Sequence, residues 1–179
     1  MKKMINPLEY AGQICSALPK GILLTTALEN KVNTMTIGWG MIGVEWGKPV
    51  FIALVRESRY TRELLRGNKE FTVNVPVGSV DKEILAFCGT KSGRDVDKIS
   101  AMNLTLETPV EINVPGIQEL PLTLECRVIY EQDQNLGGMP APVLDRYYPQ
   151  NVESSFSGSN RDHHIAFYGE IVSAYLIEE

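Results

Sequence analysis

The chain is organised around a segment that begins as Val32-Asn33-Thr34-Met35-Thr36-Ile37-Gly38-Trp39-Gly40, passes through a turn, and continues as Val50-Phe51-Ile52-Ala53-Leu54-Val55 into Arg56-Glu57-Ser58-Arg59-Tyr60-Thr61. The first piece mixes short polar side chains with apolar ones and predicts a strand. The second piece is apolar throughout and predicts a buried strand. The third piece predicts the beginning of a helix, so a strand leads directly into a helix.

The first turn of this predicted helix has the chemistry of an anion site. The unpaired N–H groups and the positive end of the helix dipole favour a phosphate. The hydroxyl groups of Ser58 and Thr61 and the guanidinium of Arg59 would add charge-assisted hydrogen bonds. The same residues also fit an ordinary helix start, in which Ser58 is the N-cap and Arg59 and Tyr60 are solvated. These four residues alone leave both interpretations open.

Length and composition indicate one globular domain over residues 1–179. A hydrophobic share of 44% and a charged share of 22% are ordinary for a globular chain and argue against wholesale disorder. The formal net charge of −5 argues against a nucleic-acid partner, because binding a polyanion usually requires a basic stripe. A local basic spot for one phosphate remains compatible with this balance.

The cysteines and the apolar runs indicate the compartment. Cys15, Cys88 and Cys126 are far apart and odd in number, which argues against a disulfide framework or a CxxC metal site and predicts reduced thiols. The first residues are too polar for a signal peptide, and no apolar run approaches the ~20 residues that a membrane span requires. We therefore expect a cytoplasmic protein that does not enter a membrane.

Short strands dominate the predicted elements. The patterns predict helices over residues 7–18, 61–66 and 79–89 and a further short helix from an Asp95 N-cap, with strands over 22–28, 32–39, 50–55, 71–75, 110–114, 120–130 and 164–177. Residues 133–162 are rich in glycine and proline and predict a long irregular connection. We therefore expect a mainly β fold, a closed antiparallel barrel with small helices packed outside it.

Three blocks, in this order, resemble the flavin reductase-like family of FMN-binding split β-barrels, and within it the flavoredoxin-like branch. They are residues 33–39, Ser58-Arg59-Tyr60-Thr61, and Phe71-Thr72-Val73-Asn74-Val75-Pro76. The likeness continues through Cys88-Gly89 and residues 92–98 and ends with His164 and Gly169-Glu170, so it covers nearly the whole chain. The resemblance implies a Greek-key-like split barrel that binds FMN.

The resemblance also implies a place for each part of the cofactor. The phosphate would lie at Ser58, Arg59, Tyr60 and Thr61, together with Lys98. The edge of the flavin ring would lie along the main chain of Asn33, Thr34, Met35 and Thr36. The other residues implied to lie near the cofactor are Trp39, Asn74, Cys88, Gly89, Ser92 and Gly93. Trp39 is either a wall for the ring or a core aromatic residue, and Asn74 either contacts the ribityl chain or satisfies a barrel bulge. Cys88 is expected to be a small buried side chain rather than a redox thiol, and Arg94 and Asp95 fit a surface pair equally well.

His164 matches the family's histidine five residues before Gly169, at the edge of the flavin pocket, whereas His163 is expected to be exposed. As the candidate catalytic residue, His164 either donates a proton, bonds the ring or contacts nicotinamide; the alternative is a structural histidine. The two histidines lack further ligands at suitable spacing, so we expect no metal site. No dinucleotide-binding or Walker motif is present, so NAD(P)H would have to stack on the flavin.

Three function classes remain. In the first, an enzyme passes electrons from NAD(P)H through FMN to a second flavin or another acceptor; in the second, a flavoredoxin-like carrier exchanges electrons with protein partners and has no nucleotide site of its own. The third is a flavin-binding barrel without activity.

The resemblance implies a homodimer. We expect residues 133–162, which contain Tyr147, Tyr148 and Phe156, to form a lid over the flavin that selects the acceptor, or else to pack on the neighbouring subunit.

Overall fold

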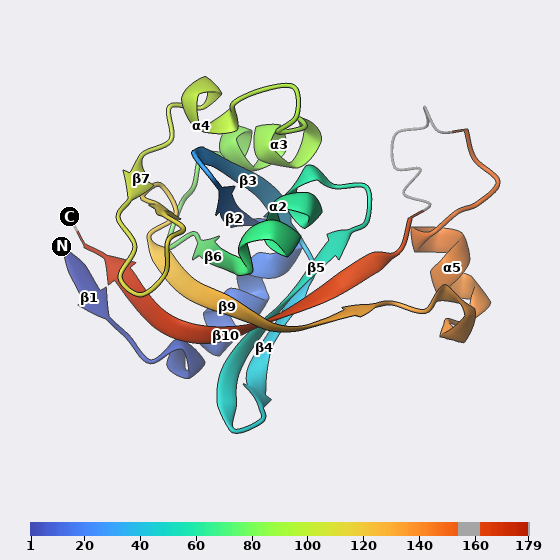
Figure 1. The fold of residues 1–179 in the computed structure, drawn as a ribbon, viewed down its shortest axis with the longest axis horizontal. Helices are drawn as coiled ribbons and strands as arrows, with labels where there is room; N and C mark the ends of the chain where they lie inside the picture. Colours follow the sequence, from blue (N-terminus) through green and yellow to red (C-terminus); the bar gives the residue numbers. More distant parts are fainter. Residues whose placement is uncertain (154–161, 179) are drawn as a thin grey trace.

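An eight-stranded antiparallel sheet dominates the fold (Figure 1). The computed structural model describes residues 1–153 and 162–178. Along the sheet the strands follow the order β3 (Lys31–Ile37), β2 (Ile22–Leu28), β6 (Glu70–Val75), β9 (Leu122–Asp133), β10 (His164–Ile177), β5 (Lys48–Arg56) and β4 (Gly40–Glu45), with β1 (Lys2–Met4) paired to β10. A separate pair is formed by β7 (Leu106–Glu107) and β8 (Gly116–Ile117). The prediction of a mainly β antiparallel fold is confirmed.

The sheet is not closed as a barrel, so that part of the prediction is wrong. Within the described residues, β3 and β4 lie at the two ends of the strand order and do not pair with each other. Helices α3 (Lys82–Thr90) and α4 (Lys98–Ala101) pack against β3, and β4 ends in the exposed hairpin turn at Trp46-Gly47. Strand alternation in a sequence indicates which side chains face the core, but it carries no information on whether two edge strands meet.

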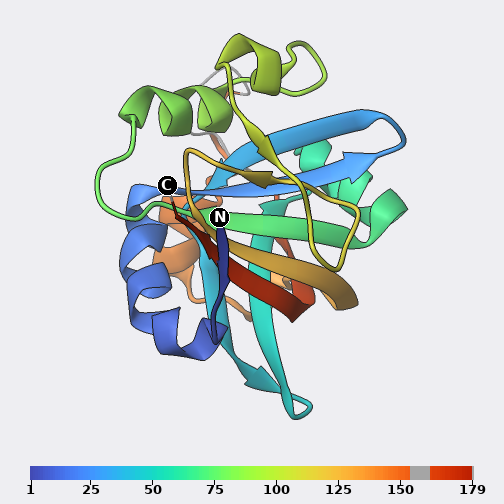
Figure 2. The same cartoon turned by 90° about the vertical axis from the view of Figure 1, so that its left-hand side faces the viewer.

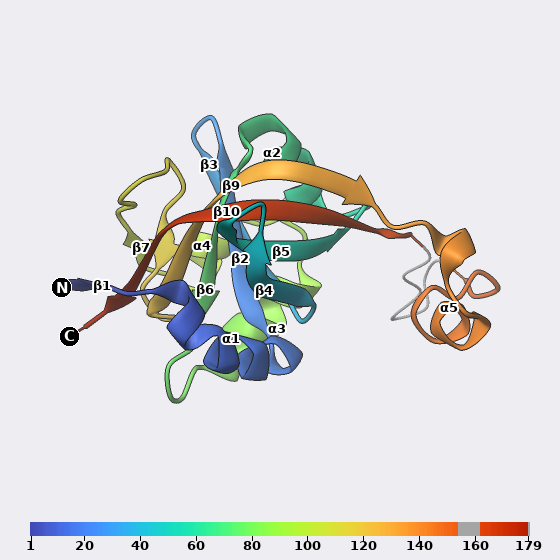
Figure 3. The ribbon, with the colours of Figure 1, turned by 90° about the horizontal axis from the view of Figure 1, so that it is seen from below.

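Short helices surround the sheet. They are η1 (Pro7–Tyr10), α1 (Ala11–Ala17), η2 (Leu18–Lys20), α2 (Tyr60–Asn68), α3 (Lys82–Thr90), α4 (Lys98–Ala101), η3 (Leu136–Gly138) and α5 (Ala141–Tyr147). Figure 2 shows the yellow-green helices α3 and α4 over the blue β2–β3 hairpin. Figure 3 shows α5 at the far end of β9 and β10, beyond the body of the sheet. None of these helices is long and apolar enough to cross a membrane.

Two predicted helix starts are wrong by a residue or two. The N-cap of α2 is Arg59, not Ser58, and the Arg59 side chain makes no capping hydrogen bond to this helix. The N-cap of α4 is Asp97, not Asp95, because the Asp97 carboxylate accepts hydrogen bonds from the N–H groups of Ile99 and Ser100. Ser58 and Arg59 both precede the helical residues of α2, and Asp95 and Asp97 both precede those of α4. Composition alone therefore does not decide which of two nearby residues is the N-cap.

Two predicted segments differ in kind. Residues 110–114 form no strand, because carboxylates satisfy their N–H groups in place of a neighbouring strand: Glu125 accepts from Val110 and Glu111. Residues 141–147, expected to be irregular, form helix α5. Its prolines lie at the helix start, where a missing N–H breaks no intrahelical bond.

The core lies against the concave side of the sheet and uses the alternating residues of the predicted strands. Its largest members, all without solvent exposure, include Phe51, Phe71, Phe167, Leu24 and Leu124. Both faces of β6 are covered, because a second cluster containing Leu23, Ile84, Cys88, Leu104, Ile117 and Leu120 lies beyond it. This double burial holds β6 in place beside the hairpin β2–β3, which carries all four predicted ring-edge residues.

Gly169 is the point at which the core tolerates no side chain. A Cβ at this position would lie 2.7 Å from Phe71 Cε1 and 2.8 Å from Cys126 Cβ. We predict that Gly169→Val lowers the free energy of unfolding by about 1–3 kcal/mol through overpacking, measured by urea denaturation. Gly43→Val is the control, because a Cβ there meets nothing within 4 Å. Equal stability of the two variants would contradict the packing described.

Candidate functional site

Two adjoining cavities, each about 160 Å³, lie where β3 meets the β5–α2 junction and the α3–α4 loop. We call the first the α2 cavity; it is lined by Asn33, Met35, Ser58, Arg59, Tyr60, Thr61, Cys88, Gly89, Lys91, Ser92, Gly93, Arg94 and Lys98. We call the second the Trp39 cavity; it is lined by Met35, Thr36, Ile37, Gly38, Trp39, Leu54, Arg56, Arg59 and His164. Met35 and Arg59 line both. The structure therefore brings together all the predicted site residues except Thr34 and Asn74.

The α2 cavity contains unpaired backbone donors at the start of α2. Within the part of the chain that the structure describes, the N–H groups of Tyr60 and Thr61 have no hydrogen-bond partner. The Thr61 hydroxyl is buried and accepts a bond from the Asn33 amide at 2.9 Å, which leaves its own proton to donate. The Ser58 N–H donates to the Asp162 carboxylate at 2.8 Å, so it is already used. The helix start therefore offers two N–H groups and one hydroxyl to a ligand.

Lys98 is a buried cation at this cavity. Its side chain is only 5% exposed, and Nζ donates to the carbonyls of Thr34 and Cys88, each at 2.9 Å. Burial lowers the pKa of Lys98 and raises the pKa of Cys88. No carboxylate within the described ranges forms an ion pair with Lys98 or Arg59. Two cations without an anionic partner, one of them buried, indicate a site for an anion.

The loop between α3 and α4 closes the α2 cavity. Arg94 lies over the Tyr60 ring at 5.2 Å and donates to the Ser58 carbonyl at 3.3 Å. It forms an ion pair with Glu63 of α2 rather than with Asp95. A Cβ on Gly93 would clash with the Asn33 side chain, so only glycine allows the loop to approach β3 this closely. The cavity is thus enclosed by contacts that join four separate elements.

Strand β3 presents a free edge to the same space. Among the described strands it pairs only with β2, and alternate residues of an edge strand point both backbone groups away from the partner strand. Because Thr34 C=O accepts from Lys98, the backbone of Thr34 points outward, and so does that of Thr36 two residues on. The Thr34 side chain is buried and bonds to Thr25. Thr34 therefore belongs to the site through its main chain only, as the resemblance implies.

Two ring side chains, Trp39 and His164, line the Trp39 cavity. Trp39 is 37% exposed, so it is not a core residue, and its ring lies 4.8 Å from His164 and 5.1 Å from Tyr147. His164 faces Arg56 across the β10–β5 pair. Burial, reinforced by the Arg56 guanidinium, lowers the pKa of His164 to about 4. His163 lies nearby at a partly exposed position, with Nε2 2.7 Å from the Asp133 carboxylate.

Asn74 lies away from both cavities. It is fully buried on β6, donates to the Thr123 hydroxyl at 2.9 Å, and lies against Thr72 at 3.3 Å. The structure thus places it in the layer between β6 and residues 104–121, whereas the resemblance implied a place near the ribityl chain.

Sequence reasoning missed Arg56 and Asp162. Arg56 donates to the carbonyls of Tyr147 and Asp162 at 3.0 and 2.7 Å, and its guanidinium lies 5.0 Å from the Tyr148 ring. It therefore fastens both ends of the connection after α5 to the strand that leads into α2. The one signal was position, since Arg56 ends a buried strand just before the predicted anion site.

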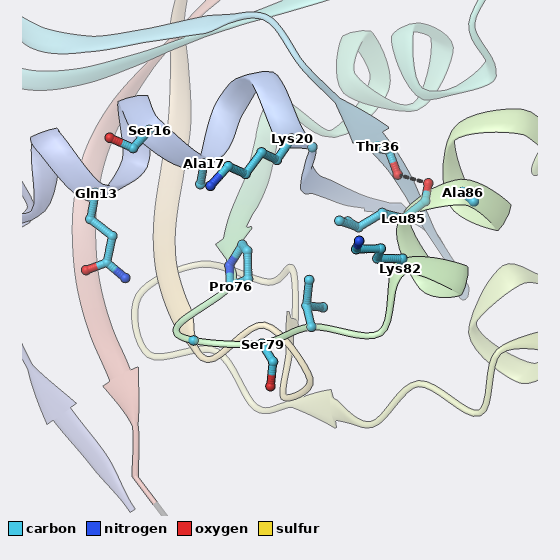
Figure 4. Close-up of a pocket in the computed structure, with 13 residues that line it drawn as sticks. Gln13, Ser16, Ala17, Lys20, Thr36, Pro76, Ser79, Lys82, Leu85 and Ala86 are labelled. Atoms are coloured by element: carbon cyan, nitrogen blue, oxygen red, sulfur yellow. Dashed lines mark hydrogen bonds between the residues drawn. The ribbon is translucent and has the colours of Figure 1, made fainter.

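A third, larger cavity of about 820 Å³ lies on the other side of Thr36 (Figure 4). It is bounded by α1, η2, the loop before α3 and the start of α3, and Figure 4 shows Lys20 and Lys82 extending into it from opposite walls. The Thr36 hydroxyl donates to the Leu85 carbonyl at 2.6 Å beside it. Of the predicted site residues, only Thr36 lines this cavity. Within residues 1–153 and 162–178, no cluster of His, Cys, Asp and Glu fits a metal ion.

This chain belongs to the flavin reductase family, because the family model described as "Flavin reductase like domain" matches residues 15–179. The predicted resemblance is therefore confirmed. A curated relative, an uncharacterized protein from Archaeoglobus fulgidus, is 31% identical over 129 residues, which cover 72% of this chain and 68% of the relative.

Solved structures show the same split-barrel fold. Flavoredoxin from Methanosarcina acetivorans is similar with a TM-score of 0.62 at 28% identity, covering 88% of this chain and 68% of that chain. An FMN-binding domain of a flavin reductases-like enzyme from Shewanella baltica OS155 has a TM-score of 0.64 at 15% identity, covering 98% and 77% respectively. The second likeness shows the fold alone.

The lowered pKa of His164 predicts a pH dependence of stability. Between the ordinary pKa of 6.5 and the folded value of about 4, the unfolded chain binds more protons at this residue than the folded chain does. We predict that stability falls as the pH falls through this window, and that His164→Gln lacks this portion of the fall. Urea midpoints measured across the window test this, with His163→Gln as the control. Parallel curves for the wild type and His164→Gln would contradict it.

Proposed function

We propose that this protein binds FMN with its phosphate in the α2 cavity. The observation that carries the proposal is the convergence of Arg59, buried Lys98 and the unpaired N–H groups of Tyr60 and Thr61 on one small cavity. A phosphate dianion would supply the negative charge that these groups lack. The donor set fits a phosphate and lies beside the outward-facing main chain of Thr34, as a phosphate-bearing flavin requires.

The ring of the flavin would lie along the free edge of β3, toward the Trp39 cavity. Backbone N–H and C=O groups of Thr34 and Thr36 face this edge and would bond the polar side of the ring. Met35, which lines both cavities, and Trp39 would provide apolar contact. The bound flavin supplies the redox chemistry, whereas the protein positions it and controls access to it.

We further propose an oxidoreductase that passes electrons from NAD(P)H through FMN to a flavin or another acceptor. The half-exposed Trp39 and the His164 ring lie at the ring end of the cleft, where a second molecule would meet the flavin. A flavoredoxin-like carrier without its own NAD(P)H site is the second candidate, and the 28% identity to a flavoredoxin supports it.

The connection formed by residues 133–162 is proposed as a lid over the ring end. Tyr147 packs edge-on against Trp39, Tyr148 is buried, and Arg56 holds the connection at both sides. Phe156, which was expected to anchor the lid, lies outside the described residues. If shortening residues 138–158 to a Gly/Ser connector leaves the acceptor profile unchanged, the lid is refuted.

A homodimer with the flavin near the subunit boundary also remains a proposal, which a monomer in light scattering would refute.

Replacing Arg59 and Thr61 together by Ala should weaken FMN binding at least tenfold. Each charge-assisted bond that is lost contributes ~1.5–3 kcal/mol before water or Lys98 compensates. Fluorescence titration with FMN measures the affinity, and circular dichroism verifies the fold of each variant. Arg62→Ala is the matched control, because Arg62 follows on the same helix but donates to the Glu57 carbonyl and does not line the cavity. Unchanged affinity in the double variant would place the phosphate elsewhere.

Anaerobic mixing of the FMN-loaded protein with NADH or NADPH separates the two candidate functions. The reductase predicts rapid bleaching of the flavin absorbance in a stopped-flow record, with a rate that rises with nucleotide concentration. The carrier predicts a flavin that remains oxidised with either nucleotide but is reduced by dithionite. A purified protein that takes up no FMN at all would refute both.

A further inference from the structure

A chain of three buried or half-buried polar side chains leads to the Trp39 cavity. The Tyr148 hydroxyl lies 3.1 Å from Oε1 of Gln134 and 2.7 Å from Nδ1 of His164. Tyr148 and His164 are 3% and 6% exposed, so water does not replace these bonds. Gln134 and His164 are also joined through their backbones, because Gln134 N–H donates to the His164 carbonyl at 2.9 Å.

The order of donors along this chain follows from valence. A glutamine Oε1 can only accept, and a tyrosine hydroxyl carries one proton. The Tyr148 proton is therefore used by Gln134. The short contact to His164 then requires that Nδ1 carries a proton and donates it to the Tyr148 oxygen. In a neutral imidazole, this leaves Nε2 without a proton and with a free lone pair.

Nε2 of His164 opens to the cavity. The ring is one of the groups that line the Trp39 cavity. Within the residues that the structure describes, Nε2 has no hydrogen-bond partner, yet it is not among the fully enclosed polar atoms that lack one. Nε2 is therefore at least partly accessible, and because the ring lines the Trp39 cavity we infer that Nε2 faces it.

The surroundings keep the imidazole neutral. Burial and the Arg56 guanidinium lower the pKa of His164 to about 4, and Arg59 and His163 act in the same direction. Asp162 acts in the opposite direction, and the Tyr148 hydroxyl contributes no charge because its own pKa is raised. At neutral pH the imidazole of His164 is therefore neutral, and its Nε2 carries no proton to donate to a ligand in the cavity.

We propose that Tyr148 is a positioning residue that, held by Gln134, fixes His164 as a hydrogen-bond acceptor at the ring end of the cleft. The site then selects a reaction partner that presents an N–H or O–H group there, such as a primary carboxamide, over one that presents only acceptors. This inference rests on the proposed function in one respect: it assumes that the reaction partner meets the flavin in the Trp39 cavity. The proton arrangement itself is a property of the protein without any ligand.

The first test is the tautomer of His164, read from imidazole nitrogen shifts in protein labelled with ¹⁵N-histidine at neutral pH. The wild type should show Nδ1 protonated and Nε2 unprotonated. Gln134→Leu removes the acceptor of the Tyr148 proton, which then turns to Nδ1 and moves the imidazole proton to Nε2. Tyr147→Phe, a change to the neighbouring tyrosine outside the chain of bonds, should leave the tautomer unchanged. A wild-type His164 protonated at Nε2 would overturn the proposal.

The second test measures binding of two probes of similar shape to the FMN-loaded protein, benzamide as an N–H donor and methyl benzoate as an acceptor only. The wild type should prefer benzamide at least tenfold, and Gln134→Leu and Tyr148→Phe should lose that preference while FMN affinity is retained. Equal affinities in the wild type, or binding of neither probe, would overturn the selection of a donor. A matching loss of FMN affinity would show that His164 contacts the cofactor instead and would also overturn it. Failure of the proposed function would appear differently, as a protein with the expected tautomer that binds no FMN.

Discussion

The buried ammonium of Lys98 is the interaction on which the candidate site depends. It joins the edge strand β3 to helix α3 through the carbonyls of Thr34 and Cys88, and among the residues that the structure describes no carboxylate forms an ion pair with it. Removing a charge from water is costly unless the charge is compensated. The two carbonyls compensate it only in part, and an anion in the α2 cavity would complete the compensation. The Lys98 ammonium thus joins two walls of the cleft, and its positive charge favours a negatively charged ligand.

The second constraint is that both parts of the site are attached to one continuous stretch of chain, from β5 through Arg56 to the start of α2. Strand β5 is paired on both sides and ends at Arg56, which holds the connection after α5, and four residues later the chain begins α2. The Asp162 carboxylate accepts from the Ser58 N–H, so the connection also contacts the approach to the helix. A group bound at the start of α2 and a group bound beside Trp39 are therefore positioned by the same few residues. This arrangement suits a cofactor that has a charged end and a flat, reactive end.

The elements that could be predicted from the sequence are those whose pattern is local. The apolar runs of residues 22–28 and 50–55 and the alternation of residues 71–75 mark strands that the structure contains, and the family blocks mark residues that it gathers around two cavities. Closure of the sheet could not be predicted, because it depends on which edges meet. The position of Asn74 could not be predicted either, since a polar residue on an alternating strand looks the same whether it faces a ligand or the Thr123 hydroxyl. Gln134, Tyr148 and His164 form one chain of hydrogen bonds only because the fold brings together the end of β9, the end of α5 and the start of β10.

The most direct test of the central claim is to map amide shifts in ¹⁵N-labelled protein on addition of FMN and, separately, of riboflavin, which lacks the phosphate. The account predicts that FMN shifts the amide signals of Tyr60, Thr61 and Gly93 together with that of Trp39. Riboflavin should perturb the Trp39 end and leave the start of α2 almost unchanged. If FMN instead perturbs the residues around Lys20 and Lys82 while Tyr60 and Thr61 do not respond, the phosphate does not bind at the start of α2. That result would contradict the proposed FMN site.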